Sequence, residues 1–248
     1  MNISFVLPCY RRAKWLAMAL RANACYFLPD AEVILVLDEP SEEREILRIA
    51  KNTPGAQFRV IVNDWDHPWR PPSIAINVGV RAATAPHVAV LSPETVIQLP
   101  RPTYLRELLA KDWRASYGGV LWHLLDADSS DDSDAIQNKA LATRNMRSPS
   151  SIGYGFVMFQ KQLFEKMHGL DESRTEYGGD DNELRQRMVL TGTRFVVDPH
   201  IHIFHPFHDG TPRKVKAEQE TPVSVILPQQ RETWGRAFSR VAYDWNSV

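Results

Sequence analysis

The stretch around which this chain is organised reads Gly169-Leu170-Asp171-Glu172 and continues, after a short interval, with Tyr177-Gly178-Gly179-Asp180-Asp181-Asn182-Glu183-Leu184. Glycine tolerates positive φ, so the paired glycines predict a sharp turn of the backbone. After them, Leu184 and Met188 recur at the i, i+4 spacing of a helix and are expected to face the core. The stretch therefore predicts a glycine turn followed directly by a helix.

Three carboxylates, those of Asp180, Asp181 and Glu183, fall in the first turn of this predicted helix. The helix dipole favours the ionised form of an acid at that position. A positioned, ionised carboxylate at the mouth of a sheet can remove a proton from an incoming hydroxyl group. Acids at helix N-termini also serve stability alone, so an ordinary acidic helix start is the alternative interpretation.

The composition indicates a globular protein without a charge bias. The length of 248 residues fits one large domain, or one domain with appendages, and 44% of the residues are hydrophobic. A net charge of −1 gives no overall attraction to nucleic acid or anionic membranes. Two cysteines exclude a disulfide-stapled secreted scaffold and favour a reducing compartment. The apolar runs are too short to cross a bilayer, and the N-terminus does not resemble a signal peptide, so we expect a cytoplasmic protein without a transmembrane segment.

Apolar runs typical of buried strands alternate with segments of helical spacing. The strands are predicted over residues 3–7, 32–37, 58–62, 87–91, 118–122, 156–159 and 194–197. The helices are predicted over residues 13–27, 41–50, 74–83, 102–111 and 163–167, with Ser41 and Ser73 as N-caps. This order is typical of βαβ units and predicts an α/β fold with a Rossmann-like, mostly parallel central sheet flanked by helices.

The C-terminal part differs from the rest. Residues 211–220 are polar and linker-like, and beyond them Trp234, Phe238, Val241 and Trp245 form an amphipathic stripe. We therefore expect a main domain over residues 1–210, and a linker with a C-terminal amphipathic helix over residues 211–248. This helical extension would pack on the body of the protein or on the second subunit of a homodimer.

Polar residues follow three of the predicted strands. They are the segments Pro8-Cys9-Tyr10-Arg11, Asp38-Glu39 and Ser92-Pro93-Glu94. In open parallel sheets, ligands bind beyond the carboxyl ends of the strands, where these segments would meet. The three segments therefore predict one binding site at that edge.

Taken together, these pieces resemble the GT-A fold glycosyltransferases of the large family two, over roughly Ile3 to His208. The matching motifs are, in order, Leu7-Pro8-Cys9-Tyr10-Arg11, Asp38-Glu39-Pro40-Ser41, Ala75-Ile76-Asn77-Val78-Gly79, Gly169-Leu170-Asp171-Glu172 and Gly179-Asp180-Asp181. In the third motif Ile76 replaces the family's arginine. The resemblance implies a GT-A fold and an enzyme that transfers a sugar from a nucleotide-sugar donor to an acceptor hydroxyl.

The resemblance also implies a donor site, with a UDP-sugar as the expected donor. Asp38 is the candidate to accept a hydrogen bond from the nucleotide base, with Glu39 as a substitute, and a strand-end acid facing solvent is the alternative. Arg11 and Arg70 are candidates for phosphate contacts, although either could be an ordinary surface charge. The full expected donor set is Pro8, Tyr10, Arg11, Asp38, Glu39, Arg70, Asn77 and Ser92.

The chain departs from the family at its metal motif, because Ser92-Pro93-Glu94 stands where the family has D-x-D. Glu94 still offers a hard oxygen ligand, whereas Ser92 keeps only a polar contact to a ribose. The implied cofactor is a divalent metal, Mn²⁺ or Mg²⁺, held by Glu94 and one histidine. His205 is the first choice and His208 the second, with a structural histidine as the alternative. A mixed carboxylate–imidazole site suits manganese or another transition ion.

For the chemical step, the resemblance implies that Asp181 is the general base that deprotonates the acceptor hydroxyl. Direct displacement would invert the anomeric centre, but a single acid does not determine the stereochemistry, so retention stays open. Asp180 and Glu183 are expected to bind the acceptor or the donor sugar. Trp122 is a candidate to stack on a sugar ring, with ordinary packing as the alternative. The Asp- and Ser-rich segment 126–151 is expected to act as a lid.

Two other functions are consistent with the residues. The altered D-x-D and the missing arginine at Ile76 favour a non-catalytic nucleotide-sugar-binding module. A nucleotidyltransferase is disfavoured, because Cys9-Tyr10-Arg11-Arg12 contains no glycine for a phosphate loop. The donor sugar stays open, and so does the acceptor, which could be a saccharide, a lipid-linked sugar, a protein or a modified nucleic acid.

Overall fold

The computed structural model describes residues 2–27, 31–64, 71–123, 155–174, 180–206, 225–237 and 239–247. In chain order, its strands are β1 (Ile3–Cys9), β2 (Glu32–Leu37), β3 (Gln57–Asn63), β4 (His87–Leu91), β5 (Val96–Gln98), β6 (Ser116–His123), β7 (Phe156–Gln160), β8 (Phe195–His205) and β9 (Ser239–Asp244). Its α-helices are α1 (Ala13–Asn23), α2 (Glu43–Asn52), α3 (Ser73–Ala82), α4 (Tyr104–Lys111), α6 (Lys161–Lys166) and α7 (Asp180–Leu190).

The described strands form one mixed sheet in the order β5-β8-β6-β7-β4-β1-β2-β3-β9. Its centre, β4-β1-β2-β3, is parallel, and so is the β6–β8 pair. β7 lies antiparallel between β4 and β6, and β5 and β9 pair antiparallel at the two edges. The predicted α/β class is therefore confirmed, with antiparallel strands added to the parallel centre.

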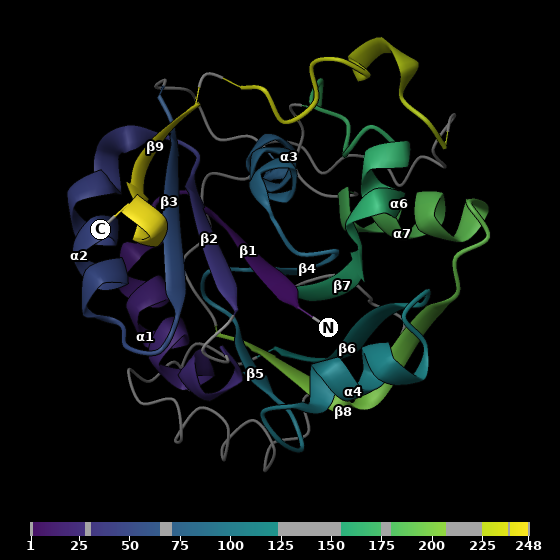
Figure 1. Cartoon of the computed structure of the whole chain (residues 1–248), viewed down its shortest axis with the longest axis horizontal. Helices are drawn as coiled ribbons and strands as arrows, with labels where there is room; N and C mark the ends of the chain where they lie inside the picture. The colour runs from purple at the N-terminus through teal and green to yellow at the C-terminus, as the bar shows by residue number, and fades with distance from the viewer. Residues whose placement is uncertain are drawn as a thin grey trace.

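Helices cover both faces of this sheet (Figure 1). On one face, α1, α2 and α4 pack on the strands through a cluster that includes Leu16, Ile46 and Leu109. On the other face, α3, α6 and α7 pack through a second cluster that includes Phe164 and Leu184. Successive side chains of a strand point to opposite faces of the sheet, so each central strand contributes to both clusters. The central strands are therefore apolar almost throughout.

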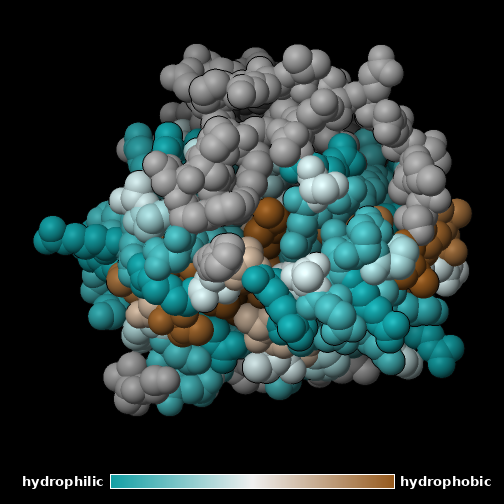
Figure 2. All heavy atoms as spheres, turned by 90° about the horizontal axis from the view of Figure 1, so that it is seen from above, coloured by the Kyte–Doolittle hydropathy of each residue, from teal (hydrophilic) through white to brown (hydrophobic). Residues whose placement is uncertain are grey.

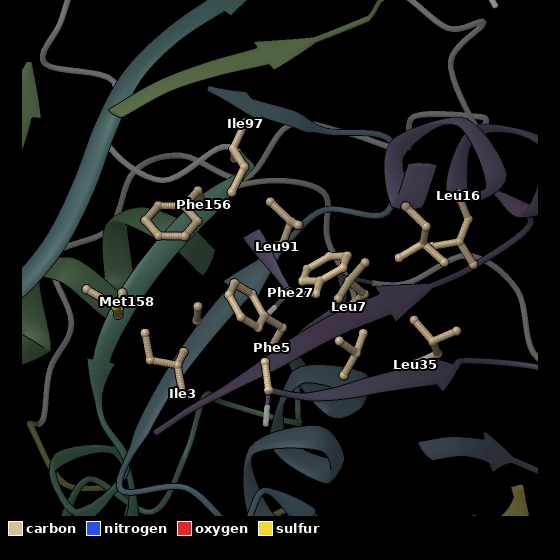
Figure 3. Packing of buried hydrophobic residues seen from close by; sticks show 14 of the residues in the cluster. Ile3, Phe5, Leu7, Leu16, Phe27, Leu35, Leu91, Ile97, Phe156 and Met158 are labelled. Carbon is tan, nitrogen blue, oxygen red and sulfur yellow. The ribbon is translucent and has the colours of Figure 1, made fainter. Parts of the chain in front are cut away.

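The first cluster is shown from close by in Figure 3. Phe5 on β1 meets Phe27 edge to face, with ring centroids 5.0 Å apart. Leu7 and Leu35 lie on the neighbouring strands β1 and β2 and are completely buried, as is Leu16 on α1. Burying a side chain of this size stabilises the fold by about 1.5–3 kcal/mol, so this cluster is a main source of stability.

A glycine sets how closely α3 approaches the sheet. A Cβ atom at Gly79 would lie 2.3 Å from a methyl carbon of Val6 on β1 and 3.0 Å from one of Val36 on β2. No side chain fits at those distances, so α3 can lie on these strands only with glycine at this position. This close approach gives a structural reason for the Ala75 to Gly79 motif.

Strand β1 continues through Pro8 to Cys9, whereas the sequence predicted that it would stop at the proline. Beyond Val6, β1 pairs only with β2, because the register with β4 covers Ile3 to Val6. Proline has no backbone N–H, and a position with one neighbouring strand tolerates that loss.

The predicted serine N-caps are wrong. Ser41 lies in a short 3-10 helix, α2 begins at Glu43, and neither Ser41 nor Ser73 makes a side-chain cap to its helix. The residue that serves a helix start is Glu42, whose Oε2 accepts hydrogen bonds from the N–H groups of Arg12 (2.6 Å) and Ala13 (3.2 Å). An acid from one helix thus satisfies the first donors of another.

The C-terminal residues form a strand rather than the expected amphipathic helix. Ser239–Asp244 is β9, which pairs antiparallel with β3 at the edge of the sheet (Figure 1). Val241, assigned to the apolar stripe, is 59% exposed, whereas Trp234 is buried against Phe164 on the α3 face. Edge pairing with β3 offers hydrogen bonds to the backbone, and this tertiary contact overrides the weak helical periodicity.

Helix α7 is held by a buried arginine. The Arg187 guanidinium donates to the carbonyls of Gly169 (2.7 Å), Met167 (2.6 Å) and Val225 (3.1 Å). It also donates to Glu183 Oε1 at 3.1 Å, and Arg187 is completely buried. Burial lowers the pKa of Arg187 from its ordinary value, and the nearby Glu183 opposes that effect.

Figure 2 shows one face of the molecule from above. In Figure 2 the described residues on this face are mainly hydrophilic, and hydrophobic ones form small separate groups. Within the described ranges, no helix combines the length and the apolar composition needed to cross a membrane.

Replacing Arg187 by methionine is expected to lower the free energy of unfolding by about 3–5 kcal/mol, because Glu183 and the three carbonyls would lose their buried partner. Arg185→Met on the same helix is the matched control and should change stability by less than about 1 kcal/mol. Urea unfolding followed by circular dichroism measures both. Equal effects of the two substitutions would contradict this account of α7.

Stability is also expected to fall in mild acid because of His87 on β4. Burial lowers the pKa of His87 below 6.5, and its Nε2 lies 3.0 Å from the carbonyl oxygen of Trp113. As the pH falls through 6.5, the unfolded chain binds a proton at His87 while the folded chain does not, so the free energy of unfolding decreases. His87→Gln should show a smaller decrease than the wild type in urea titrations between about pH 7.5 and 5.

Candidate functional site

The site lies at the carboxyl edge of the parallel strands. β1, β2, β3 and β4 end there at Cys9, Leu37, Asn63 and Leu91. The N–H of Asp38, just beyond β2, donates to the carbonyl of Cys9 at 2.7 Å and ties the first two ends together. From the sequence we expected three polar segments to meet at this edge, and the register of the strands brings them there.

Asp38 is held by a partner that the sequence analysis missed. Asp38 is buried, and its Oδ1 accepts a hydrogen bond from Asn63 Nδ2 at 2.7 Å. Asn63 is the last residue of β3 and is completely buried. An asparagine at the end of an apolar strand is the sequence signal for such a pair, but the sequence does not identify the acid that accepts its hydrogen bond. The pair fixes the orientation of the Asp38 carboxylate at the site edge.

Glu39 faces Arg11 across the ends of β1 and β2. The Arg11 guanidinium lies 3.6 Å from Glu39 Oε2 and 5.1 Å from the ring centroid of Tyr10. Ser41 Oγ donates to the other carboxylate oxygen of Glu39. The side chain of Arg11 is 58% exposed and its φ is +53°, a conformation that non-glycine residues rarely adopt. Such backbone strain occurs often at binding sites.

Glu94 and His205, the first-choice metal ligands, are in contact. His205 Nε2 lies 3.1 Å from Glu94 Oε1, although 111 residues separate them in the chain. Their side chains are 17% and 10% exposed. β8 runs parallel to β6 and ends at His205, so its last residue reaches the edge where the Ser92 to Glu94 segment follows β4.

The Glu94 segment is a tight turn. Thr95 N–H donates to the carbonyl of Ser92 at 3.0 Å, and Ser92 N–H donates to the carbonyl of Gly155 at 3.1 Å. Ser92 is half-buried beside this turn. A carboxylate and an imidazole in contact are a donor set that fits a divalent transition ion. Within the described ranges, no group of three or more such side chains surrounds a metal position, and the second-choice ligand, His208, lies outside them.

Asn77 is in the interior, so its expected role as a donor contact is corrected. Its Nδ2 donates to Leu170 O (2.9 Å) and Glu172 Oε1 (2.8 Å), and its Oδ1 accepts from Leu170 N–H at 2.8 Å. Gly169 has φ +75°, and a Cβ atom there would lie 2.6 Å from Asn77 Oδ1. Asn77 therefore binds the turn at Gly169 to α3 and positions it.

Glu183 is also corrected, from acceptor contact to ion-pair partner. Its carboxylate contacts Arg187 on one oxygen and Arg174 on the other, the latter at 2.9 Å. Glu183 is 7% exposed. With both oxygens engaged and little exposure, it stabilises the first turns of α7 rather than offering a surface to a sugar.

Trp122 packs inside the protein, which removes it as a sugar-stacking platform. It is 9% exposed, lies stacked with Phe204, and donates from Nε1 to His202 Nδ1 at 3.1 Å. That bond needs an unprotonated Nδ1 on His202, and burial lowers the pKa of His202 accordingly.

Asp181 is half-buried in the first turn of α7. α7 leads into β8, which begins beside Ser116 at the opposite edge of the sheet, so α7 starts toward the carboxyl edge and ends away from it. The start of α7, with Asp181, therefore lies toward the same edge of the sheet as the strand ends that carry Asp38 and Glu94. Arg70, the glycine pair Gly178-Gly179, the 126–151 segment and the side chain of Asp180 lie outside the described residues.

Sequence comparison adds a match to a family profile described as the N-terminal domain of galactosyltransferase, over residues 138–209. This segment contains the glycine turn and α7, and it extends through β8 to the histidines. A relative from Caenorhabditis elegans, named probable N-acetylgalactosaminyltransferase 9, is 28% identical over 134 residues. That alignment covers 53% of this chain but only 23% of the relative, so the chain spans less than a quarter of that protein.

Structure comparison finds similar folds in TarS from S. aureus. One TarS structure has a TM-score of 0.60 at 13% identity, covering 84% of this chain and 37% of TarS. The complexes of TarS 1-349 with UDP-GlcNAc and with UDP each have a TM-score of 0.58, at 13% and 14% identity. They cover 85% and 82% of this chain, and each covers 60% of the TarS fragment. This chain therefore shares the fold of TarS, and its residues 138–209 match the galactosyltransferase profile.

Proposed function

We propose that this protein is a glycosyltransferase that moves a sugar from a UDP-sugar donor to an acceptor hydroxyl. The observation that carries the proposal is the contact between Glu94 and His205 at the carboxyl edge of the sheet. Ligands of open parallel sheets bind at that edge, and a carboxylate–imidazole pair suits a divalent cation. The UDP and UDP-GlcNAc complexes of TarS and the name of the C. elegans relative support a UDP-sugar as the donor.

The donor would lie across the ends of β1, β2 and β4. The oriented carboxylate of Asp38 is suited to accept a hydrogen bond from the base. Arg11 is exposed beside Glu39 and can turn toward a phosphate, for which guanidinium is a strong partner. Tyr10, Pro8 and Ser92 complete this side of the proposed site.

Glu94 and His205 would hold the divalent metal, Mn²⁺ or Mg²⁺, which when bound offsets the negative charge that grows on the departing diphosphate. Glu94 is fixed by the turn that Thr95 closes, and His205 by the end of β8. The side chains of Glu94 and His205 are therefore held in place before a metal ion binds, which lowers the entropic cost of binding it.

Asp181 is proposed as the general base that takes the proton from the acceptor hydroxyl. It lies in the first turn of α7, where the helix dipole favours a negative charge. Attack on the face opposite the leaving diphosphate would invert the anomeric centre, and the proposal is therefore of an inverting enzyme. A cytoplasmic location belongs to the proposal, supported by the free thiols of buried Cys9 and exposed Cys25.

A non-catalytic nucleotide-sugar-binding module is the second candidate. The observation that favours it is Ser92-Pro93-Glu94, in which one acid replaces the two of D-x-D. A binding module would bind UDP in calorimetry and transfer no sugar to any acceptor. Assays with UDP-GlcNAc, UDP-GalNAc and UDP-galactose against saccharide, lipid-linked, protein and nucleic-acid acceptors separate the two candidates.

Asp181→Asn is expected to lower kcat for sugar transfer by about 10²–10⁴-fold, with the affinity for UDP unchanged, because only the proton acceptor is removed. Asp171→Asn is the matched control. The Asp171 carboxylate accepts a hydrogen bond from the N–H of Ser173 at 2.9 Å, and we expect this substitution to change kcat little. A kcat near wild type for Asp181→Asn would show that the base is misassigned. The anomeric configuration of the product, read by NMR, tests inversion.

Glu94→Gln keeps the size of the side chain but removes the charge that a metal ion needs. We expect the concentration of Mn²⁺ that gives half-maximal activity to rise at least about 10-fold, whereas Glu107→Gln, at an exposed acid on α4, leaves it unchanged. Activity that is insensitive to chelator in the wild type would exclude the metal from the proposal.

A further inference from the structure

The last residue of α1, Asn23, is a polar side chain that the sequence analysis did not single out. It is completely buried. Its Nδ2 donates to the carbonyl of Thr95 at 2.9 Å, and its Oδ1 accepts from the N–H of Ile97 at 2.9 Å. One amide therefore satisfies a carbonyl and an N–H on the same edge of β5, which is how a neighbouring strand would pair with it.

The opposite edge of β5 pairs with β8. Val96 lies opposite Phe204, the residue before His205, and Ile97 lies opposite Ile203. Thr95 directly follows Glu94. Asn23 thus holds the short segment whose start carries Glu94 and whose partner strand ends in His205. Figure 3 shows Ile97 of β5 pointing into the core toward Leu91 and Phe156, so β5 is anchored on that side by packing.

The turn that carries Glu94 has little room to adjust. Gly155 has φ +105°, and a Cβ atom there would lie 2.8 Å from Thr95 Oγ1 and 2.8 Å from a methyl carbon of Ile203. The backbone of residue 155 therefore lies close to Thr95 at the start of β5, and Asn23 holds the same segment by its hydrogen bonds. If the amide is lost, the carbonyl of Thr95 and the N–H of Ile97 lose their buried partner, and the start of β5 loses the hydrogen bonds that hold it to α1.

We propose that Asn23 is a positioning residue for the Glu94–His205 pair and thereby sets the affinity of the site for a divalent cation. The part that concerns the cation rests on the proposed function. The part that concerns the geometry of the pair does not, and the two parts can be measured separately.

The chain offers a matched control at the other end of β5. Tyr26, three residues beyond Asn23, accepts a hydrogen bond from Leu99 N–H at 3.0 Å and donates to Leu99 O at 3.5 Å. It makes the same kind of two-bond link from the end of the α1 segment to the edge of β5, but away from Glu94. Tyr26→Phe therefore removes a comparable link without touching the turn.

The experiment compares wild type, Asn23→Leu, Asn23→Asp and Tyr26→Phe in the full chain. Asn23→Asp keeps the acceptor for Ile97 but replaces the donor to Thr95 by a carboxyl oxygen, and it places that carboxyl group in the interior. The first readout is the imidazole ¹⁵N signal of His205 in metal-free protein, assigned with His205→Gln. The second is the affinity for Mn²⁺, measured by electron paramagnetic resonance of free Mn²⁺ with UDP present.

We expect both Asn23 variants to shift the His205 signal and to weaken Mn²⁺ binding about 10-fold, as substitutions behind metal ligands do. Tyr26→Phe should leave both unchanged even where it lowers the melting temperature. Unchanged His205 signals in the Asn23 variants, or equal changes in Tyr26→Phe, would overturn the positioning role. If the wild type binds no Mn²⁺, the metal part of the proposed function fails, and the His205 signals still decide whether Asn23 positions the pair.

Discussion

A completely buried guanidinium needs an acceptor for its donors, because an unsatisfied charge in the interior is very costly. Arg187 meets this constraint with the carbonyls of Met167, Gly169 and Val225 and with the carboxylate of Glu183. Those acceptors come from three separate segments, so the turn at Gly169, helix α7 and the C-terminal segment are bound to one another through a single side chain. The acidic first turn of α7 is positioned as a consequence.

Glu172 joins the Gly169 turn to the C-terminal segment a second time and adds a link to α3. Its Oε1 accepts from Asn77 Nδ2 (2.8 Å) on α3 and from the N–H of Gly235 (2.6 Å) near the C-terminus. Gly79 lets α3 lie directly on β1 and β2. The turn is bound to α3, so the parallel centre of the sheet fixes its position through that helix. The strand ends that carry Asp38 and Glu94 and the helix that carries Asp181 therefore share one rigid support.

Much of the site was visible in the sequence because strand ends are local features. The runs that form β2 and β4 predicted that Asp38 and Glu94 follow strands, and parallel pairing then brings them to one edge. The roles of Asn77, Glu183 and Trp122 were not predictable. The local sequence does not show whether an amide, a carboxylate or an indole faces a cleft or the interior. Asn23 and Asn63 were missed for the same reason: their partners are distant in the chain.

The amino-acid sequence by itself determined the alternation of strands and helices, the polar strand ends and the acidic start of α7, since each depends on the spacing of apolar residues within one segment. Only the tertiary structure decided that Glu94 contacts His205 across 111 residues, that Arg187 and Glu183 pair in the interior, and that residues 239–244 join the sheet as β9. These outcomes depend on burial and on hydrogen-bond partners supplied by other segments, and a local pattern contains neither.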